Sequence, residues 1–136
     1  DLFSGVGSFG LECLSRGAKN VTFLESYADV LSVLKKNIDN LNQQNQTKVI
    51  EKDIFSENTL KLLNDKFDII FMDPPYKEKK LPFLLNAITK LELLNTDGII
   101  IIHRHKKEDD DLPKEFNLIL EKNYGISKII FGNILT

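Results

Sequence analysis

Two nearly continuous apolar runs constrain the fold of this chain more than any other feature. Residues 67–72 read FDIIFM, and residues 99–102 are four isoleucines that follow Gly98. Such runs are typical of strands in parallel sheets that are covered on both faces. Between them, apolar residues recur at a spacing that predicts a helix; they are Leu81, Leu84, Leu85, Ile88 and Leu91. The order strand, helix, strand therefore predicts a parallel crossover unit.

The remainder of the chain repeats this alternation. Further strands are expected at residues 2–3 (a strand end), 21–24 and 48–51, and in a hairpin over 116–122 and 127–131. Further helices are expected over residues 9–16, from the capping-box pair Ser26 and Asp29 to about Leu41, and over 57–64. We therefore predict a single α/β domain over residues 1–136. Its doubly wound, Rossmann-like sheet is mostly parallel and ends in an antiparallel hairpin strand.

Length and composition fit a globular domain and exclude several classes of protein. The 136 residues are 42% hydrophobic and 28% charged, which is ordinary for such a domain. No apolar run approaches the ~18–20 residues that span a bilayer, and no signal peptide is recognisable. The single cysteine, Cys13, excludes an internal disulfide and a cysteine-based metal cluster, so no metal and a cytoplasmic location are predicted. The chain opens without Met, with residues typical of a strand end, and we expect it to be truncated at the N-terminus.

Charge is weak overall but unevenly distributed. The formal net charge of −2 gives no global electrostatic footprint for nucleic acid. Basic residues nevertheless gather at Lys77, Lys79 and Lys80, and again over residues 103–107. The simplest interpretation of both runs is a solvated loop. Residues 106–113, which include four consecutive acidic residues, are expected to form a mobile polar loop.

Three glycines near the start, Gly5, Gly7 and Gly10, have the G-x-G-x-x-G spacing of dinucleotide-binding loops. The spacing alone also fits a tight turn without a ligand. Glu25 ends the second expected strand, where a carboxylate can accept both hydroxyls of a ribose. Asp1 argues against NAD, because a carboxylate would oppose the pyrophosphate that such a loop receives. S-adenosylmethionine carries a sulfonium and an ammonium group and no phosphate, so a nearby carboxylate would attract it.

The tetrapeptide Asp73-Pro74-Pro75-Tyr76 follows the fourth expected strand directly. Two prolines fix the backbone and remove two N–H donors. Asp73 and the Pro74 carbonyl could accept the two hydrogens of an exocyclic amino group, and Tyr76 could stack on the base that carries it. The alternative is a stiff turn in which Tyr76 is a hydrophobic lid.

The stretches DLFSGVGSFGLECLSRGAKNVTFLE, FDIIFMDPPY and DGIIII together resemble the RsmD-type family of class I methyltransferases. The resemblance implies transfer of a methyl group from S-adenosyl-L-methionine to N2 of a guanine in 16S ribosomal RNA, with the rRNA or the small ribosomal subunit as partner. By position, it assigns cofactor binding to Asp1, Phe3, Gly5, Gly7, Glu25, Asp53, Ile54 and Asp73. It assigns the target site to Asp73, Pro74, Pro75 and Tyr76.

Within this assignment, Asp1, Gly5 and Gly7 would line the methionine side of the cofactor. Glu25 would hold the ribose, while Asp53 and the Ile54 backbone would face the adenine. The chain departs from the family pattern in two respects. An N-terminal segment is missing, and His103 stands where the family often has a glutamate; we interpret His103 as a strand-end residue.

Four alternatives remain open. A DNA adenine-N6 methyltransferase would use the same tetrapeptide, but no target-recognition insert is visible. A glutamine methyltransferase would usually carry Asn in place of Asp73. A C5-pyrimidine methyltransferase needs a late nucleophilic cysteine, and Cys13 lies early and is interpreted as a small core residue. Outside enzymes, the chain could be an inactive cofactor-binding fragment. The oligomeric state cannot be inferred from the sequence.

Overall fold

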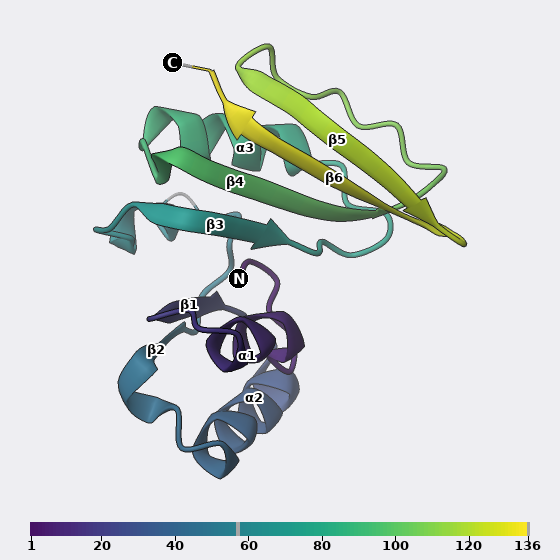
Figure 1. Cartoon of the computed structure of the whole chain (residues 1–136). Helices are drawn as coiled ribbons and strands as arrows, with labels where there is room; N and C mark the ends of the chain where they lie inside the picture. Colours follow the sequence, from purple (N-terminus) through teal and green to yellow (C-terminus); the bar gives the residue numbers. More distant parts are fainter. Residues whose placement is uncertain (57, 136) are drawn as a thin grey trace. The chain divides into compact units, whose positions relative to one another are not determined.

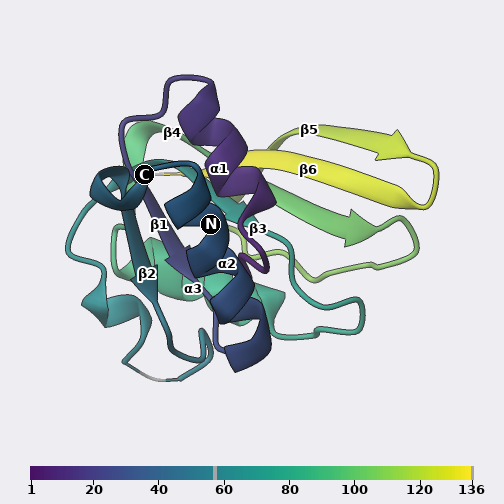
Figure 2. The same cartoon turned by 90° about the horizontal axis from the view of Figure 1, so that it is seen from below.

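The computed structural model describes residues 1–56 and 58–135. The chain divides into two compact units, residues 1–56 and residues 57–136, and each is described by itself. Figure 1 shows the elements of both units, and Figure 2 shows them from a second direction. That residues 1–136 act as a single domain stays a prediction.

The first unit is built on two parallel strands, β1 (Val21–Leu24) and β2 (Thr47–Ile50), paired along their whole length. Leu2 forms a parallel bridge to Leu24, which confirms the expected strand end beside β1. Helix α1 (Ser8–Ser15) precedes β1, and helix α2 (Ala28–Asn40) joins β1 to β2 through a short 3-10 turn, Gln44–Gln46. This is the predicted alternation.

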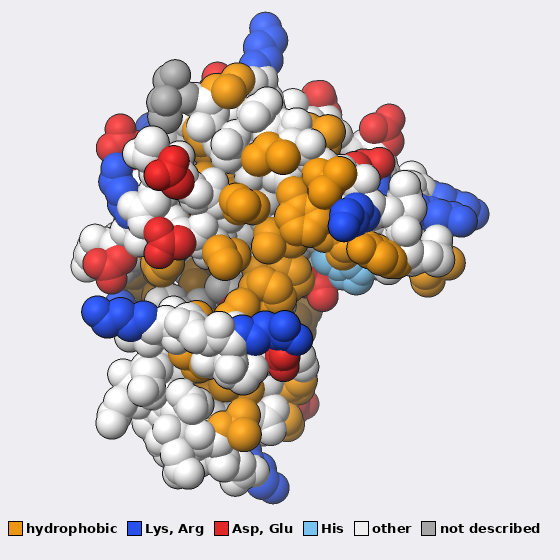
Figure 3. Space-filling view, viewed as in Figure 1, with side chains coloured by type: hydrophobic (Ala, Val, Ile, Leu, Met, Phe, Trp, Pro, Cys, Tyr) orange, Lys and Arg blue, Asp and Glu red, His pale blue; other side chains and the backbone are white. Residues whose placement is uncertain are grey.

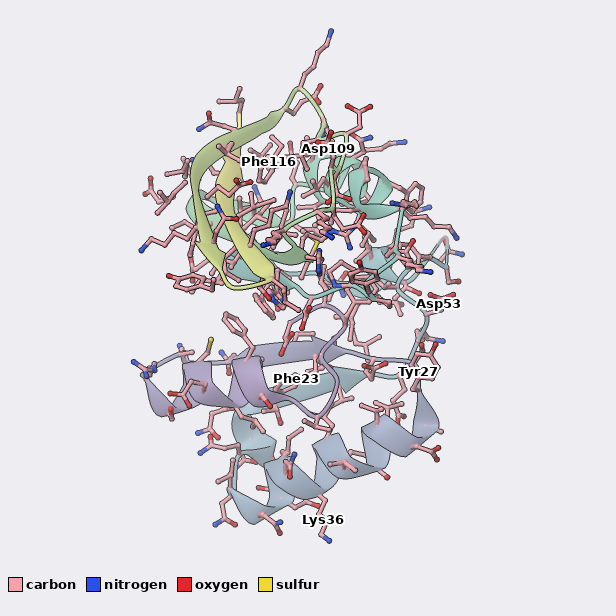
Figure 4. All side chains as sticks on the ribbon, turned by 90° about the vertical axis from the view of Figure 1, so that its right-hand side faces the viewer. Phe23, Tyr27, Lys36, Asp53, Asp109 and Phe116 are labelled. Atoms are coloured by element: carbon pink, nitrogen blue, oxygen red, sulfur yellow. The ribbon has the colours of Figure 1, made fainter. Side chains whose placement is uncertain are left out.

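The core of the first unit lies around Phe23, which Figure 4 labels. Phe23 is fully buried and packs with Leu31, Leu34 and Ile38 from one face of α2. These three residues follow the spacing expected for an amphipathic helix. Val33, on another part of α2, and Leu41, its C-cap, are 43% and 55% exposed and lie outside this core.

The second unit is a four-stranded sheet with the order β3-β4-β6-β5. Its strands are β3 (Phe67–Met72), β4 (Leu94–His105), β5 (Phe116–Tyr124) and β6 (Ser127–Ile134). β3 and β4 are parallel and are joined by α3 (Leu81–Lys90), whereas β6 runs antiparallel to both β4 and β5. The parallel crossover and the terminal hairpin are therefore both confirmed.

Helix α3 lies on one side of this sheet (Figures 1 and 2). Strand residues alternate between faces, and Ile70 and Ile100 are buried while Ile69 and Ile99 are 51% and 39% exposed. Apolar side chains therefore gather on the face of the sheet that Figure 3 shows in front. The expectation that these strands are buried on both faces is therefore wrong at Ile69 and Ile99.

Other local predictions are also corrected. Ser26 does not cap α2: the N-cap is Tyr27, without a side-chain cap, and the Glu25 carboxylate accepts hydrogen bonds from the N–H groups of Ser26 and Tyr27. The helix expected over residues 57–64 is reduced, among the described residues, to a 3-10 turn at Leu60–Leu62; residue 57 lies outside the described part. A helix this short has little cooperative support.

The hairpin turn lies between the two expected strands, at Gly125 and Ile126, where Gly125 has a φ of 58°. Glycine at the first central position suits the primed turns that match the twist of a hairpin. None of the helices in the described ranges is long and apolar enough to cross a bilayer.

Candidate functional site

The turn over residues 3–7, between the bridge at Leu2 and helix α1, has an unusual backbone. Phe3, Gly5 and Gly7 have φ values of 60°, 55° and 90°, all in the left-handed region. For a bulky side chain such as Phe3 this is an outlier that costs about 1–3 kcal/mol, and such strain clusters at ligand sites. The Asn37 side chain of α2 donates to the Val6 carbonyl at 2.9 Å and helps to hold the turn.

The three glycines have different physical roles. A Cβ on Gly5 would meet nothing within 4 Å, so this stretch of backbone is open. A Cβ on Gly7 would lie 2.4 Å from Leu34 Cδ1. A Cβ on Gly10 would lie 2.3 Å from the Phe23 ring. Gly7 and Gly10 therefore bring the turn and α1 close to the core, whereas Gly5 leaves backbone accessible to a ligand.

Glu25 joins this turn to the start of α2. Its Oε1 accepts a hydrogen bond from Gly5 N at 2.9 Å, and its Oε2 accepts from Ser26 N at 2.9 Å and Tyr27 N at 3.2 Å. A carboxylate offers about four lone-pair sites, so capacity remains for a ribose hydroxyl. Glu25 is thus a fixed carboxylate at the end of β1.

Asp1 has a structural role that the sequence did not reveal. Its Oδ2 accepts a hydrogen bond from Gly10 N at 3.1 Å. Gly10 lies in the first turn of α1, whose N-cap, Gly7, has no side chain to cap the helix. Asp1 therefore caps α1 although it lies outside the helix. Its negative charge also interacts favourably with the positive end of the helix dipole.

Asp53 and Ile54 follow β2, as expected, but their side chains differ in exposure. Asp53 is exposed, and its Oδ1 accepts from Phe55 N at 3.0 Å, which closes an Asx-type turn. Ile54 is buried. The Phe3 and Phe55 rings lie 5.7 Å apart. Figure 4 shows Asp53 and Tyr27 at the same end of the first unit, where the parallel strands finish.

In the second unit, Asp73 lies directly after β3 and contacts His103. The Asp73 Oδ1 and the His103 Nδ1 are 2.9 Å apart, and the two side chains are 50% and 35% exposed. His103 is therefore more than the strand-end residue that the sequence suggested. It fixes Oδ1 of the Asp73 carboxylate, while no hydrogen bond to Oδ2 is found in the described part of the chain.

Tyr76 is 54% exposed and contacts His105 edge to face, with ring centroids 4.9 Å apart. The prolines between Asp73 and Tyr76 differ in exposure: Pro74 is buried and Pro75 is exposed. The Pro75 carbonyl accepts from Glu78 N at 2.9 Å, whereas the Pro74 carbonyl accepts no backbone hydrogen bond within the described ranges. Pro74 therefore retains an acceptor, and Tyr76 presents an open ring.

Arg104, between the two histidines, is almost completely buried. Its guanidinium donates to both oxygens of Asp110, at 2.8 and 2.9 Å, and to the carbonyls of Glu78 at 2.8 Å and Pro75 at 3.4 Å. Glu108 lies 3.5 Å away. The basic run over residues 103–107 is therefore not simply a solvated loop, and the acidic run after it is tied to the sheet.

The chain matches the family described as conserved hypothetical protein 95 over residues 1–133. The chain belongs to this family. A relative from Haemophilus influenzae, named ribosomal RNA small subunit methyltransferase D, is 30% identical over 131 residues, which are 93% of this chain and 66% of the relative. The RsmD-type resemblance is confirmed.

Solved structures agree with the family. A provisionally assigned methylase from Haemophilus influenzae is 32% identical, with a TM-score of 0.83 over 99% of this chain and 86% of that chain. A methyltransferase from Podospora anserina, bound to SAH, is 16% identical, with a TM-score of 0.74 over 96% of this chain and 68% of that chain; it shares the fold alone. The predicted class I methyltransferase fold is thus confirmed.

Two features of the RsmD-type chain bear on its chemistry. Cys13 is half-buried, and burial raises the pKa of its thiol, which suits a packing residue and not a nucleophile. The residues that the structure describes contain no group of three or more His, Cys, Asp or Glu side chains that could hold a metal ion. The functional roles assigned to individual residues stay predictions.

Proposed function

We propose that this chain transfers a methyl group from S-adenosyl-L-methionine to N2 of a guanine in small-subunit rRNA. The observation that carries the proposal is the Asp73 carboxylate, held by His103 at the end of β3 and followed by the rigid Pro74-Pro75-Tyr76 turn. The family and the name of the Haemophilus influenzae relative support rRNA as the substrate. The chain spans 66% of that relative's length. That the chain has the activity named for the whole relative is therefore a proposal.

The turn in the first unit fits the proposed cofactor. The backbone at Gly5 is open, and Asp1 and Glu25 place two carboxylates around the turn, where they would attract cationic groups and accept ribose hydroxyls. Asp53 and the Ile54 backbone would serve the adenine, and Phe3 would line the site. The bound cofactor would supply an electrophilic methyl group on a sulfonium.

In the second unit, the residues suit an exocyclic amino group. Its nitrogen is a weak nucleophile because its lone pair is conjugated with the ring. Asp73 Oδ2 and the Pro74 carbonyl would accept its two hydrogens, drawing the nitrogen towards tetrahedral geometry. His103, with its proton on Nδ1, would hold the carboxylate in that orientation. The nitrogen would give up one proton as it gains the methyl group, and the Asp73 carboxylate would accept it.

Tyr76 would hold the base. Stacking of a base on an aromatic ring is worth ~1–3 kcal/mol, and the target must leave its helix or loop to reach such a ring. The edge-to-face contact with His105 restrains the Tyr76 ring, which is still 54% exposed. Rigidity of this turn would reduce the entropy that is lost when the base binds.

Replacing Glu25 by glutamine should weaken binding of S-adenosylmethionine by about tenfold or more, because a charge-assisted hydrogen bond contributes roughly 1.5–3 kcal/mol. In glutamine, the NH₂ that replaces one carboxylate oxygen is a donor. It would meet another donor, either Gly5 N–H or the N–H groups of Ser26 and Tyr27. Titration calorimetry measures the change. Glu51→Gln, at an exposed residue after β2, is the control. If the Glu25 variant binds S-adenosylmethionine with unchanged affinity, Glu25 holds the turn and does not bind the cofactor.

His103 offers a second test. His103→Leu removes the hydrogen bond to Asp73 and should slow methyl transfer by about 10- to 100-fold, since small errors in position have effects of this size. His103→Asn can place an amide N–H near the former Nδ1 and should retain most of the rate. Single-turnover kinetics compare the two variants. Equal rates for the Leu and Asn variants would show that the hydrogen bond does not matter.

The decisive experiment is to incubate the chain with labelled S-adenosylmethionine and unmodified small subunits, naked rRNA or adenine-containing duplex DNA, and to map the label by mass spectrometry. Label on guanine N2 of the rRNA is the expected result, and the preferred form of rRNA shows the assembly state of the substrate. Label on adenine N6 of DNA would replace the proposal. Cofactor binding without transfer to any substrate would favour an inactive binding fragment.

A further inference from the structure

The Arg104 side chain lies beside the proposed target turn and is held there by several hydrogen bonds. It comes from β4, its side chain is 1% exposed, and its three nitrogens donate to four oxygens. Two of these oxygens belong to Asp110 and two are backbone carbonyls of Pro75 and Glu78. Arginine suits this position because its planar group has five N–H donors in a fixed arrangement.

The two carbonyls mark the ends of one tight turn. The Pro75 carbonyl also accepts from Glu78 N at 2.9 Å, and the Glu78 Oε1 accepts from the backbone N–H groups of Lys79 and Lys80, just before α3. Arg104 therefore contacts both ends of the segment that contains Tyr76. Without it, the Pro75 carbonyl would retain only the hydrogen bond within its own turn.

Asp110 balances the buried charge. It binds Arg104 through both oxygens, and its own side chain is 6% exposed. Glu108 adds a second carboxylate and is paired with Lys79 at 3.0 Å, and the hydrogen bond from Lys79 lowers the pKa of Glu108. The acidic run is thus connected on one side to β4 and on the other to the segment before α3.

Strand geometry distributes the contacts around the turn. Successive side chains of a strand point to opposite faces. His103 and His105 therefore share one face and contact Asp73 and Tyr76, whereas Arg104 points to the other face and contacts the backbone of the same turn. Three consecutive residues of β4 hold the proposed target turn from two sides.

We infer that Arg104, with Asp110 as its counter-ion, is a positioning residue that fixes the turn over residues 74–78 for the incoming base. The consequence for methylation rests on the proposed function; the consequence for the turn does not. A buried ion pair contributes little net stability compared with a well-packed apolar pair. The double substitution Arg104→Met with Asp110→Leu therefore separates stability from positioning, because it removes the buried charges together with the bonds to the two carbonyls.

The test compares four chains: the unmodified chain, Arg104→Met, the double variant, and Arg104→Lys, whose single amine cannot reach Asp110 and both carbonyls. Arg104→Met should lower the unfolding midpoint because Asp110 stays buried without its partner, and the double variant should recover most of it. Hydrogen exchange of the amides of residues 76–80 should nevertheless accelerate about tenfold or more in the double and Lys variants. Arg16→Met, at an exposed ion pair with Glu12, is the matched control and should change neither quantity.

For methylation of small-subunit rRNA, kcat should fall by about 10- to 100-fold in the double and Lys variants, while the affinity for S-adenosylmethionine stays unchanged. Unaltered exchange and unaltered kcat in a folded double variant would overturn the inference, and the Lys variant decides the matter if the double variant fails to fold. If the unmodified chain does not methylate rRNA, the proposed function fails, and the exchange rates still decide whether Arg104 fixes the turn.

Discussion

Replacing Asp73 by alanine is expected to slow methyl transfer by roughly 10²–10⁴-fold, the range for a positioned acid–base group. The variant loses the oxygen that would accept an amino hydrogen, and it leaves His103 without the partner at 2.9 Å. Affinity for S-adenosylmethionine should stay nearly intact, because most of the residues assigned to the cofactor lie in the first unit. Single-turnover methylation and titration calorimetry measure the two effects separately.

Asp65→Ala is a suitable control for this prediction, since Asp65 is an exposed carboxylate that precedes the same strand, β3. It should leave both the rate and the affinity unchanged. A normal rate in the Asp73 variant would show that the carboxylate takes no part in the transfer. A large loss of cofactor affinity would instead show that Asp73 acts mainly through the cofactor, to which the resemblance also assigns it.

Much of the fold could be predicted because its signals are local. The apolar runs at β3 and β4, the helix between them and the glycine turn before α1 each lie within a few consecutive residues. The position of the Asp73–Tyr76 tetrapeptide at a strand end followed from the same signals. Sequence pattern and position were therefore enough to predict the candidate site residues.

The partners of these residues could not be predicted, because they are set by contacts that are distant along the chain. His103 meets Asp73 across 30 positions, and Arg104 meets Pro75 across 29. In the sequence, Arg104 is one member of a basic run and resembles a solvated residue. Alternation along β4 was the available signal: if His103 and His105 lie on one face, Arg104 must lie on the other.

Local capping rules failed for a similar reason. Ser26 fits a capping box, yet the Glu25 carboxylate takes the N–H groups before α2 and α2 begins after Tyr27. Asp1 was interpreted only as an attraction for a cationic ligand, and its bond to Gly10 shows that it also caps α1. In both cases a side chain from a neighbouring strand end replaced the helix's own cap.

Gly10 provides the second large effect, and here helix propensity and packing predict opposite signs. Gly10 lies inside α1, where alanine is normally more stable than glycine by about 0.5–1 kcal/mol. An added Cβ, however, would lie 2.3 and 2.7 Å from two Phe23 ring atoms and 2.8 Å from Val21 Cγ1. Since Phe23 is fully buried in the core, the ring has little room to move.

Gly10→Ala should therefore destabilise the chain, and Gly10→Val should do so by roughly 1–3 kcal/mol or more, the usual effect of overpacking. Because α1 would be pushed from β1, the turn that carries Gly5 should shift as well, and affinity for S-adenosylmethionine should fall. Urea unfolding followed by circular dichroism measures the stability. Gly10→Ala should cost less stability in a Phe23→Leu background than in the unmodified chain, because the smaller leucine leaves room for the added Cβ. If Gly10→Ala instead raises the free energy of unfolding, helix propensity outweighs the contact with Phe23.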